Sequence, residues 1–302
     1  MRLWRVSAAC ARFFWDIMHM RERLIRTTAL GTLLIAPMGA SASDEKSAYS
    51  LFRPTPDALL REMSTDRPDK TESPYTVDAG RFQVEMDLFA FTYDDTGAVA
   101  TRTWDVIPFN FKIGLTHDTD LQLVFGSFSR IATRDGDAET RTVSSGNGDL
   151  VVRIKRNIWG NDGGRTALAV MPFVKLPANT LPELNDAVEG GVIVPLAIDL
   201  GGGVGLGLMT EVDLLKNEER GGYSPTFINS ATVGFDLTKQ LGLYLEIFTE
   251  RNTERGAELV ATFDAGLTYA LADNVQIDVG VNLGLTEAAD DFALFAGQST
   301  RF

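Results

Sequence analysis

The chain has 302 residues, of which 44% are hydrophobic and 23% charged, and its formal net charge is −13 at pH 7. So acidic a composition argues against a nucleic-acid-binding protein, because that binding depends on phosphate neutralisation by Lys and Arg. Cys10 is the only cysteine, which excludes a disulfide framework and a cysteine-based metal site.

The first predicted element is a secretory signal peptide at residues 1–42. A basic stretch around Arg23 precedes an apolar run at 29–38, and Ala40-Ser41-Ala42 supplies a small-residue cleavage site. The apolar run is shorter than the ~20 residues of a membrane-spanning helix, which disfavours the alternative of an anchor. Two methionines beside the basic stretch are candidate translation starts: Met18 and Met20.

Residues 43–80 form an irregular N-terminal segment, since they contain four prolines and no sustained hydrophobic period. We expect this segment to lie in the periplasm or to plug a barrel. Its dense polar motif at 65–74 directly precedes the first strand. We therefore hypothesise that the motif enters the periplasmic mouth, where Arg67, Asp69 and Lys70 pair with charges in the lumen. Asp66 is a further candidate site residue of this motif.

Residues 81–302 are predicted to be all β, with about twelve antiparallel strands that form an outer-membrane β-barrel. An even number of strands is typical of bacterial membrane barrels. The expected strands are 81–91, 101–115, 121–129, 149–159, 166–175, 190–200, 203–215, 225–237, 241–250, 257–269, 275–285 and 292–302.

The connections between these strands alternate between short and long. Short turns are expected at 117–120, 160–165, 201–202, 238–240 and 270–274, and longer loops at 93–100, 130–148, 176–189, 216–224, 251–256 and 286–291. Membrane barrels have short periplasmic turns and long extracellular loops. This order predicts that both termini are periplasmic.

Strand length indicates which face points inward, because alternation alone fits a soluble barrel as well as a membrane barrel. The segments run to roughly 10 to 13 residues, against ~9 to 11 for a tilted transmembrane strand and ~5 to 6 in soluble sheets. We therefore expect the apolar face to meet lipid. Three prolines interrupt strands of a closed sheet, where we expect local bulges: Pro108, Pro172 and Pro195.

An apolar exterior places a charged face inside the barrel. Basic residues come from the earlier strands and acidic residues from the later ones, so that charges of opposite sign face one another across the lumen. The expected lumen-lining residues, which would set selectivity through charge, are Lys112, Arg153, Lys155, Lys175, Glu211, Asp213, Glu246 and Asp264. The alternative is that these charges pair and fill a small closed barrel.

Enzyme activity is not expected. His117 is the single histidine beyond the leader and falls in a predicted periplasmic turn, away from outer-leaflet substrates. Glu211 and Asp213 could share a proton, but such spacing is common in a chain this acidic. No His or Cys spacing fits a metal site, and acidic loops around 135–139 or 290–291 give only a weak calcium pattern. We expect no cofactor.

Several motifs resemble the outer-membrane family named for the MetA pathway of phenol degradation. They are Thr65-Asp66-Arg67-Pro68-Asp69-Lys70-Thr71-Glu72-Ser73-Pro74, the stretches 77–85, 171–177, 189–196, 280–286 and 289–291, and the Arg301-Phe302 ending. The resemblance implies an outer-membrane barrel that moves small, often aromatic or hydrophobic compounds, and it offers no catalytic residues.

The sequence thus predicts an outer-membrane channel or transporter for passive uptake of small molecules. The alternatives are a closed structural or surface-interaction barrel and a soluble periplasmic binding barrel. Expected partners are the lipid bilayer, small solutes and the barrel-assembly machinery, for which the terminal Phe302 would be the recognition signal.

Overall fold

The computed structural model describes residues 46–184, 186–217 and 220–302, so the expected signal peptide lies outside the described residues. No helix in this described part has the length and apolarity needed to cross a membrane. A short 3-10 helix, η2, spans Asp57–Leu59. The strands are β1 (Phe82–Asp95), β2 (Val99–Val106), β3 (Phe109–Thr116), β4 (Thr119–Phe125), β5 (Phe128–Asp135), β6 (Thr140–Gly146), β7 (Leu150–Trp159), β8 (Thr166–Leu176), β9 (Glu189–Asp199), β10 (Val204–Lys216), β11 (Tyr223–Asp236), β12 (Leu241–Asn252), β13 (Val260–Ala272), β14 (Val275–Gly284) and β15 (Phe292–Arg301).

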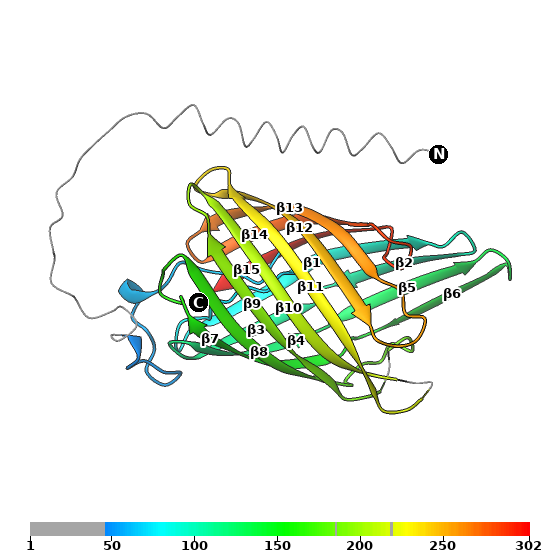
Figure 1. Cartoon of the computed structure of the whole chain (residues 1–302), viewed down its shortest axis with the longest axis horizontal. Helices are drawn as coiled ribbons and strands as arrows, with labels where there is room; N and C mark the ends of the chain where they lie inside the picture. Colours follow the sequence, from blue (N-terminus) through cyan, green and yellow to red (C-terminus); the bar gives the residue numbers. More distant parts are fainter. Residues whose placement is uncertain (1–45, 185, 218–219) are drawn as a thin grey trace. The chain divides into compact units, whose positions relative to one another are not determined.

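These strands form one antiparallel sheet that closes on itself (Figure 1). The closing pair is β1 with β15, in which Gln83 lies opposite Arg301. We use the word stave for one complete crossing of the barrel wall. Three staves each consist of two consecutive strands in line with one another: β2 and β3, β4 and β5, and β6 and β7. Among the described residues the barrel therefore has twelve staves, which confirms the predicted strand number.

The first divided stave breaks at Ile107 and Pro108. Proline has no N–H to donate to a ladder, and Ile107 adopts a left-handed φ of 54°, an unfavourable conformation for a β-branched residue. Here β1 changes partner from β3 to β2. The expected bulges at Pro172 and Pro195 are wrong, since the pairs on both sides of each proline keep one register.

Two of the predicted long loops are also wrong. Residues 93–100 and 130–148 are mostly strand, and the turns between strands shrink to 96–98 and 136–139. As a result β2, β5 and β6 extend beyond the end of the barrel that lies away from the C-terminus (Figure 1). We call β2, β5 and β6 the outer extension. Within it, β6 pairs with β5 alone.

The alternating faces point as predicted. Neighbouring residues of β7 illustrate the contrast, because Ile154 is 46% exposed whereas Lys155 is 0% exposed. Across the barrel the outward face carries exposed apolar side chains, among them Val174, Leu214, Ile247, Val279 and Leu294, while the lumen buries charged and amide side chains. This arrangement, apolar outside and polar inside, is that of a membrane barrel.

Candidate functional site

The lumen of the barrel holds a segment of the chain itself. Residues 64–76, which we call the plug, precede β1 and contact inward-facing residues of strands on every side. The plug is bent back on itself: Ser64 and Ser73 share a hydrogen bond of 2.7 Å, and the Asp66 carboxylate accepts the backbone N–H of Ser73 at 2.9 Å. Pro68 and Pro74 keep this stretch from joining a β-ladder.

Asp66 connects the plug to the basic wall of the lumen. Its carboxylate lies 2.5 Å from Lys112 Nζ of β3 and 2.6 Å from Lys155 Nζ of β7. Lys112 also pairs with Glu85 of β1, whose carboxylate accepts the Asp66 backbone N–H at 3.0 Å. Burial alone would raise the pKa of Asp66, but the two lysines hold it well below its ordinary value. Farther along the plug, Glu72 pairs with Arg153 of β7 at 2.6 Å.

Arg67 and Lys70 connect the plug to the acidic wall. The Arg67 guanidinium lies 2.7 Å from Asp278 of β14 and 2.7 Å from Asp87 of β1. Lys70 Nζ lies 3.2 Å from the Asp264 carboxylate of β13. The plug therefore turns Asp66 and Glu72 toward the basic wall, and Arg67 and Lys70 toward the acidic wall, so that these buried charges are paired.

Glu246 of β12 binds the plug backbone. Its two carboxylate oxygens accept the N–H groups of Lys70 and Thr71, each at 2.9 Å. The Thr71 hydroxyl lies 2.6 Å from Ser230 Oγ and 2.7 Å from Thr232 Oγ1, both on β11. These hydrogen bonds to the backbone fix the position of the plug along the lumen, in addition to the ion pairs made by its side chains.

Asp69 differs from the other charged residues of the plug because it forms no ion pair with the described residues, so the predicted pairing through Asp69 is not found there. Burial raises the pKa of Asp69 well above its ordinary value, and the nearby Glu246 carboxylate raises it further. The docked plug therefore favours the protonated form of Asp69 relative to a solvated carboxyl.

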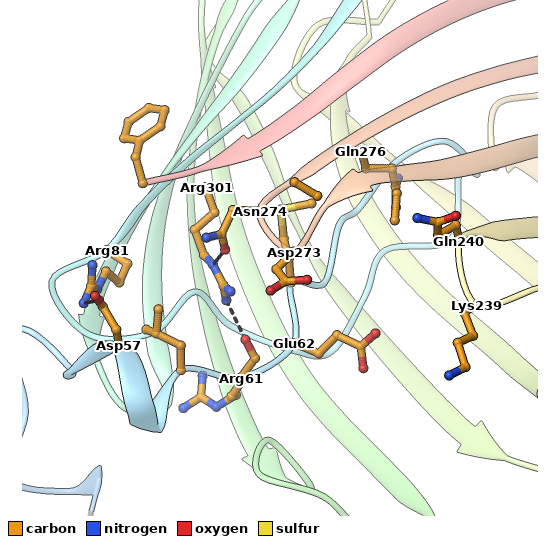
Figure 2. A pocket seen from close by; sticks show the side chains of 15 residues that line it. Asp57, Arg61, Glu62, Arg81, Lys239, Gln240, Asp273, Asn274, Gln276 and Arg301 are labelled. Carbon is orange, nitrogen blue, oxygen red and sulfur yellow. Dashed lines mark hydrogen bonds and ion pairs between the residues drawn. The ribbon is translucent and has the colours of Figure 1, made fainter.

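At the mouth of the barrel where β1 begins and β15 ends, a second set of ion pairs secures the chain before the plug. Arg61 donates its backbone N–H to Asp78 at 3.0 Å and pairs with Asp162 of the β7–β8 turn at 2.9 Å. Figure 2 shows Arg301 donating to the Arg61 carbonyl, a bond of 2.8 Å, with Asn274 accepting a second bond from Arg301 at 2.9 Å. These contacts join the N-terminal segment to the last strand.

A cavity of about 830 Å³ lies beside these contacts, between the N-terminal segment and the turns that precede β12 and β14. Its labelled side chains are almost all charged or amide groups, including Glu62, Lys239, Gln240 and Asp273 (Figure 2). The cavity forms a polar vestibule at this mouth.

A second cavity, of about 800 Å³, runs beside the plug along a wall built from β9 to β12. Glycines on the inward face of this wall leave the space open. Gly205 of β10 and Gly234 of β11 lie opposite one another, and a Cβ added at either would meet no atom within 4 Å. The plug thus fills only part of the lumen, and the glycine wall borders the remainder.

Apolar side chains also face the lumen, which the alternation of the sequence did not reveal. Met171, Ile193, Met209 and Ile228 form a buried cluster on β8 to β11, against which Phe173 and Phe248 pack. Phe248 also lies under the Lys70 ammonium, 4.4 Å from the ring centroid. The wall near the plug is therefore mixed, with apolar surface next to charge.

The predicted lumen-lining residues fall into two groups. Lys112, Arg153, Lys155, Glu246 and Asp264 all contact the plug. The remaining three face the lumen without an ion pair or hydrogen bond to the described residues of the plug. Of these, Lys175 forms ion pairs with Asp149 and Glu189. The other two, Glu211 and Asp213, lie two positions apart on β10 and therefore share its inward face.

Sequence reasoning did not select several residues that hold the plug. Thr71 and Glu72 lie inside the motif at 65–74. The run of polar residues in this motif was the signal that could have identified them. Glu85 and Asp278 alternate with apolar neighbours on their strands, as the selected residues do, and only their contacts distinguish them. Phe302 is 60% exposed, and its backbone exchanges two 2.9 Å hydrogen bonds with Phe82.

His117 has a structural environment. It lies in the turn between β3 and β4, where its carbonyl accepts hydrogen bonds from Arg61 and Asn161 and its imidazole lies 3.4 Å from Asp118. Across the described residues, no group of three or more His, Cys, Asp or Glu side chains is arranged to hold a metal ion.

One solved channel shares the barrel fold of this chain, and two further solved structures are similar at lower TM-scores. The COG4313 outer membrane channel from Pseudomonas putida F1 superposes with a TM-score of 0.57 at 12% identity, covering 79% of this chain and 100% of that one. The translocator domain of the autotransporter NalP from Neisseria meningitidis gives 0.47 at 10% identity, over 74% and 88% of the two chains. The transport unit of AIDA-I from Escherichia coli gives 0.45 at 11%, over 86% and 96%.

No curated protein matches the chain. A family profile, however, matches residues 65–302, which begin at the plug motif and run to the C-terminus. The match covers residues 65–76 of the plug and every described strand of the barrel. The chain therefore belongs to the family described as "Putative MetA-pathway of phenol degradation".

Proposed function

We propose that the protein is an outer-membrane channel for the passive uptake of small molecules, and that the plug controls its opening. The observation that carries this proposal is the plug itself, whose charges match both walls of the lumen while a cavity of about 800 Å³ remains beside it. A barrel built only for structure has no use for such an open, glycine-lined space. No step of the proposal is catalytic.

The solutes we propose are small and amphipathic, including aromatic compounds. The apolar cluster of Met171, Ile193, Met209 and Ile228 is buried close to the charged plug and would be uncovered when the plug shifts. Such a wall favours a molecule with an apolar body and one charged or polar group. The family description points to the same class of compound.

The orientation we propose places both termini in the periplasm of a Gram-negative bacterium. Two observations support it: β1 and β15 begin and end at the same mouth, and the connections at that mouth are short. The exposed Phe302 at the end of the closing strand would then be available to the barrel-assembly machinery.

Single-channel recording in a planar bilayer tests the proposal. We expect small resting current steps through the cavity beside the plug, larger openings when the plug shifts, and block of both by an aromatic carboxylate. A disulfide between Thr71→Cys and Ser230→Cys, whose present hydroxyls lie 2.6 Å apart, should abolish the larger openings until it is reduced.

Each single cysteine variant is a control for the disulfide, because it carries one of the two substitutions but cannot form the cross-link. A barrel that is correctly folded, as judged by heat-modifiable mobility, and that passes no current in any state would contradict the proposal. That outcome would leave a closed structural barrel as the remaining interpretation.

A further inference from the structure

Four exposed arginines gather on one face of the outer extension. Arg102 lies on β2, Arg130 and Arg134 on β5, and Arg141 on β6. The strand register places Arg130 opposite Trp104 and Arg134 opposite Arg141, so all four side chains share one face of the sheet. We call this set the arginine patch.

The patch lies on the outside of the barrel. Arg102 pairs across the sheet with Tyr93 of β1, and Tyr93 lies opposite Phe292 of β15, on the same side as the exposed Leu294. The other face of the extension carries hydroxyl residues such as Thr101, Thr103 and Thr133. The sequence thus directs guanidinium groups outward and neutral polar groups inward.

None of the four arginines has an ion-pair partner within the described residues. The acids nearest the patch are used in turns: Asp95 accepts from Gly97 N–H at 2.8 Å, and Asp135 accepts from the N–H groups of 137 and 138. The guanidinium donors of the patch remain available to an external anion.

The level of the patch along the barrel indicates which anion it meets. Exposed aromatic side chains at the same level, Trp104, Phe128 and Phe292, are 37% to 47% exposed, as expected of the belt at a membrane interface. Arg102 and Arg130 adjoin this belt, and Arg134 and Arg141 lie farther out. Charged groups beside an aromatic belt lie at the depth of lipid headgroups.

We propose that the arginine patch binds the phosphate groups of outer-leaflet lipid. The patch borders a hollow of about 1070 Å³ next to the belt, which could hold the headgroup. Tyr93, Trp104 and three acids, Asp95, Asp135 and Glu139, also line this hollow, so the four arginines outnumber the carboxylates there by one. Guanidinium groups bind phosphate through paired, charge-assisted hydrogen bonds. This inference rests on the proposed orientation, in which the outer extension faces the cell exterior.

Binding of lipid A, the phosphorylated glycolipid, to the refolded full chain in detergent tests the inference, with native mass spectrometry as the readout. We expect the double variant Arg130→Gln/Arg134→Gln to bind at least about tenfold more weakly. The matched control, Arg156→Gln/Arg165→Gln, removes the same charge at the opposite end and should bind like the parent chain. Lysines at 130 and 134 should restore part of the affinity.

Three outcomes would overturn the lipid assignment: equal binding by the two double variants, equal binding of lipid A stripped of its phosphates, and full competition by inorganic phosphate alone. The last would identify a site for the free anion. Heat-modifiable mobility of each variant confirms that the barrel has folded.

A cysteine at Asp137, in the turn at the tip of the outer extension, separates this inference from the proposed orientation. Labelling of Asp137→Cys in intact cells by a membrane-impermeant reagent confirms that the tip is outside. If the tip is labelled but lipid A binding does not depend on its phosphates, the inference about the arginine patch is wrong and the orientation stands. If the tip is not labelled, the proposed orientation is wrong.

Discussion

Asp66 and Arg67 are consecutive in the chain, yet their side chains reach opposite walls of the barrel. The Asp66 carboxylate lies 2.6 Å from Lys155 Nζ on β7, and the Arg67 guanidinium lies 2.7 Å from Asp278 on β14. Four staves, β15, β1, β3 and β4, separate those two strands by the shorter way around the sheet. Two consecutive residues of the plug therefore form ion pairs with both walls of the lumen.

Replacing Asp66 with alanine should release the plug and raise single-channel conductance. The substitution leaves Lys112 and Lys155 buried with one fewer acceptor, and an uncompensated buried charge typically costs about 3–5 kcal/mol. The measurement is the fraction of time spent at the higher conductance level. Asp57→Ala, which removes an exposed carboxylate from the same N-terminal segment, is the control, and equal open fractions for the two variants would exclude a holding role for Asp66.

Arg67 and Asp278 should be energetically coupled. A double-mutant cycle with Arg67→Ala and Asp278→Ala, measured by urea unfolding in micelles, is expected to give a coupling free energy of roughly 0.5–3 kcal/mol. The second contact of Arg67, with Asp87, stays intact in the Asp278→Ala variant. Strict additivity of the two single variants would show that the pair contributes nothing to docking.

Rising pH should open the channel through Asp69. The docked plug raises the pKa of Asp69, so the docked state holds a proton that the released, solvated carboxyl gives up above about pH 4. Docking is therefore most favourable at low pH and weakens as pH rises toward the docked pKa.

The measurement for Asp69 is conductance against pH for the parent chain and for Asp69→Asn, which stays neutral at every pH. We expect the parent to open as pH rises and the variant to lose most of that response. Asp57→Asn serves as the comparison, because Asp57 lies in the exposed η2 turn. A parent channel that closes with rising pH would have the opposite sign and would contradict the assignment.

Filling the glycine wall should reduce the resting current. Gly234→Phe places a ring in space where no atom now lies within 4 Å of the new Cβ, and phenylalanine suits a strand better than glycine does. Val233→Phe, the neighbouring position on the outward face, adds a similar bulk toward lipid. We expect a reduced current in Gly234→Phe alone; currents that match between the two variants would mean that ions do not pass along this wall.

The sequence predicted those features that produce a regular alternation. Strand number, the outward apolar face and the charged interior all follow from a period of two, as at Ile154 and Lys155. The strand at residues 140–146 was not predicted, because its sequence TRTVSSG is polar on both faces and shows no alternation of apolar and polar residues. Met171 and Ile193 were missed for the converse reason, since their neighbours are also apolar and both faces of the strand look alike.

The candidate site was predicted as a set of residues and not as a set of contacts. The charges of the plug motif and of the walls could be listed from the sequence, and five of the eight lumen residues do contact the plug. Which acid meets which base depends on how the irregular segment bends. Hydrogen bonds between Ser64 and Ser73 and from Thr71 to β11 set that bend, and hydroxyl pairs carry no periodic signal.

The pairing of β1 with β15 has a consequence for assembly. The first strand after the plug is hydrogen-bonded to the last strand of the chain, with Gln83 opposite Arg301, so the wall cannot close until the C-terminal residues have been made. The plug belongs to the earlier part of the same chain, and the lysines of β3 and β7 precede the acids of β13 and β14. Because the plug directly precedes β1, the segment that fills the lumen is covalently attached to one strand of the pair that closes the wall.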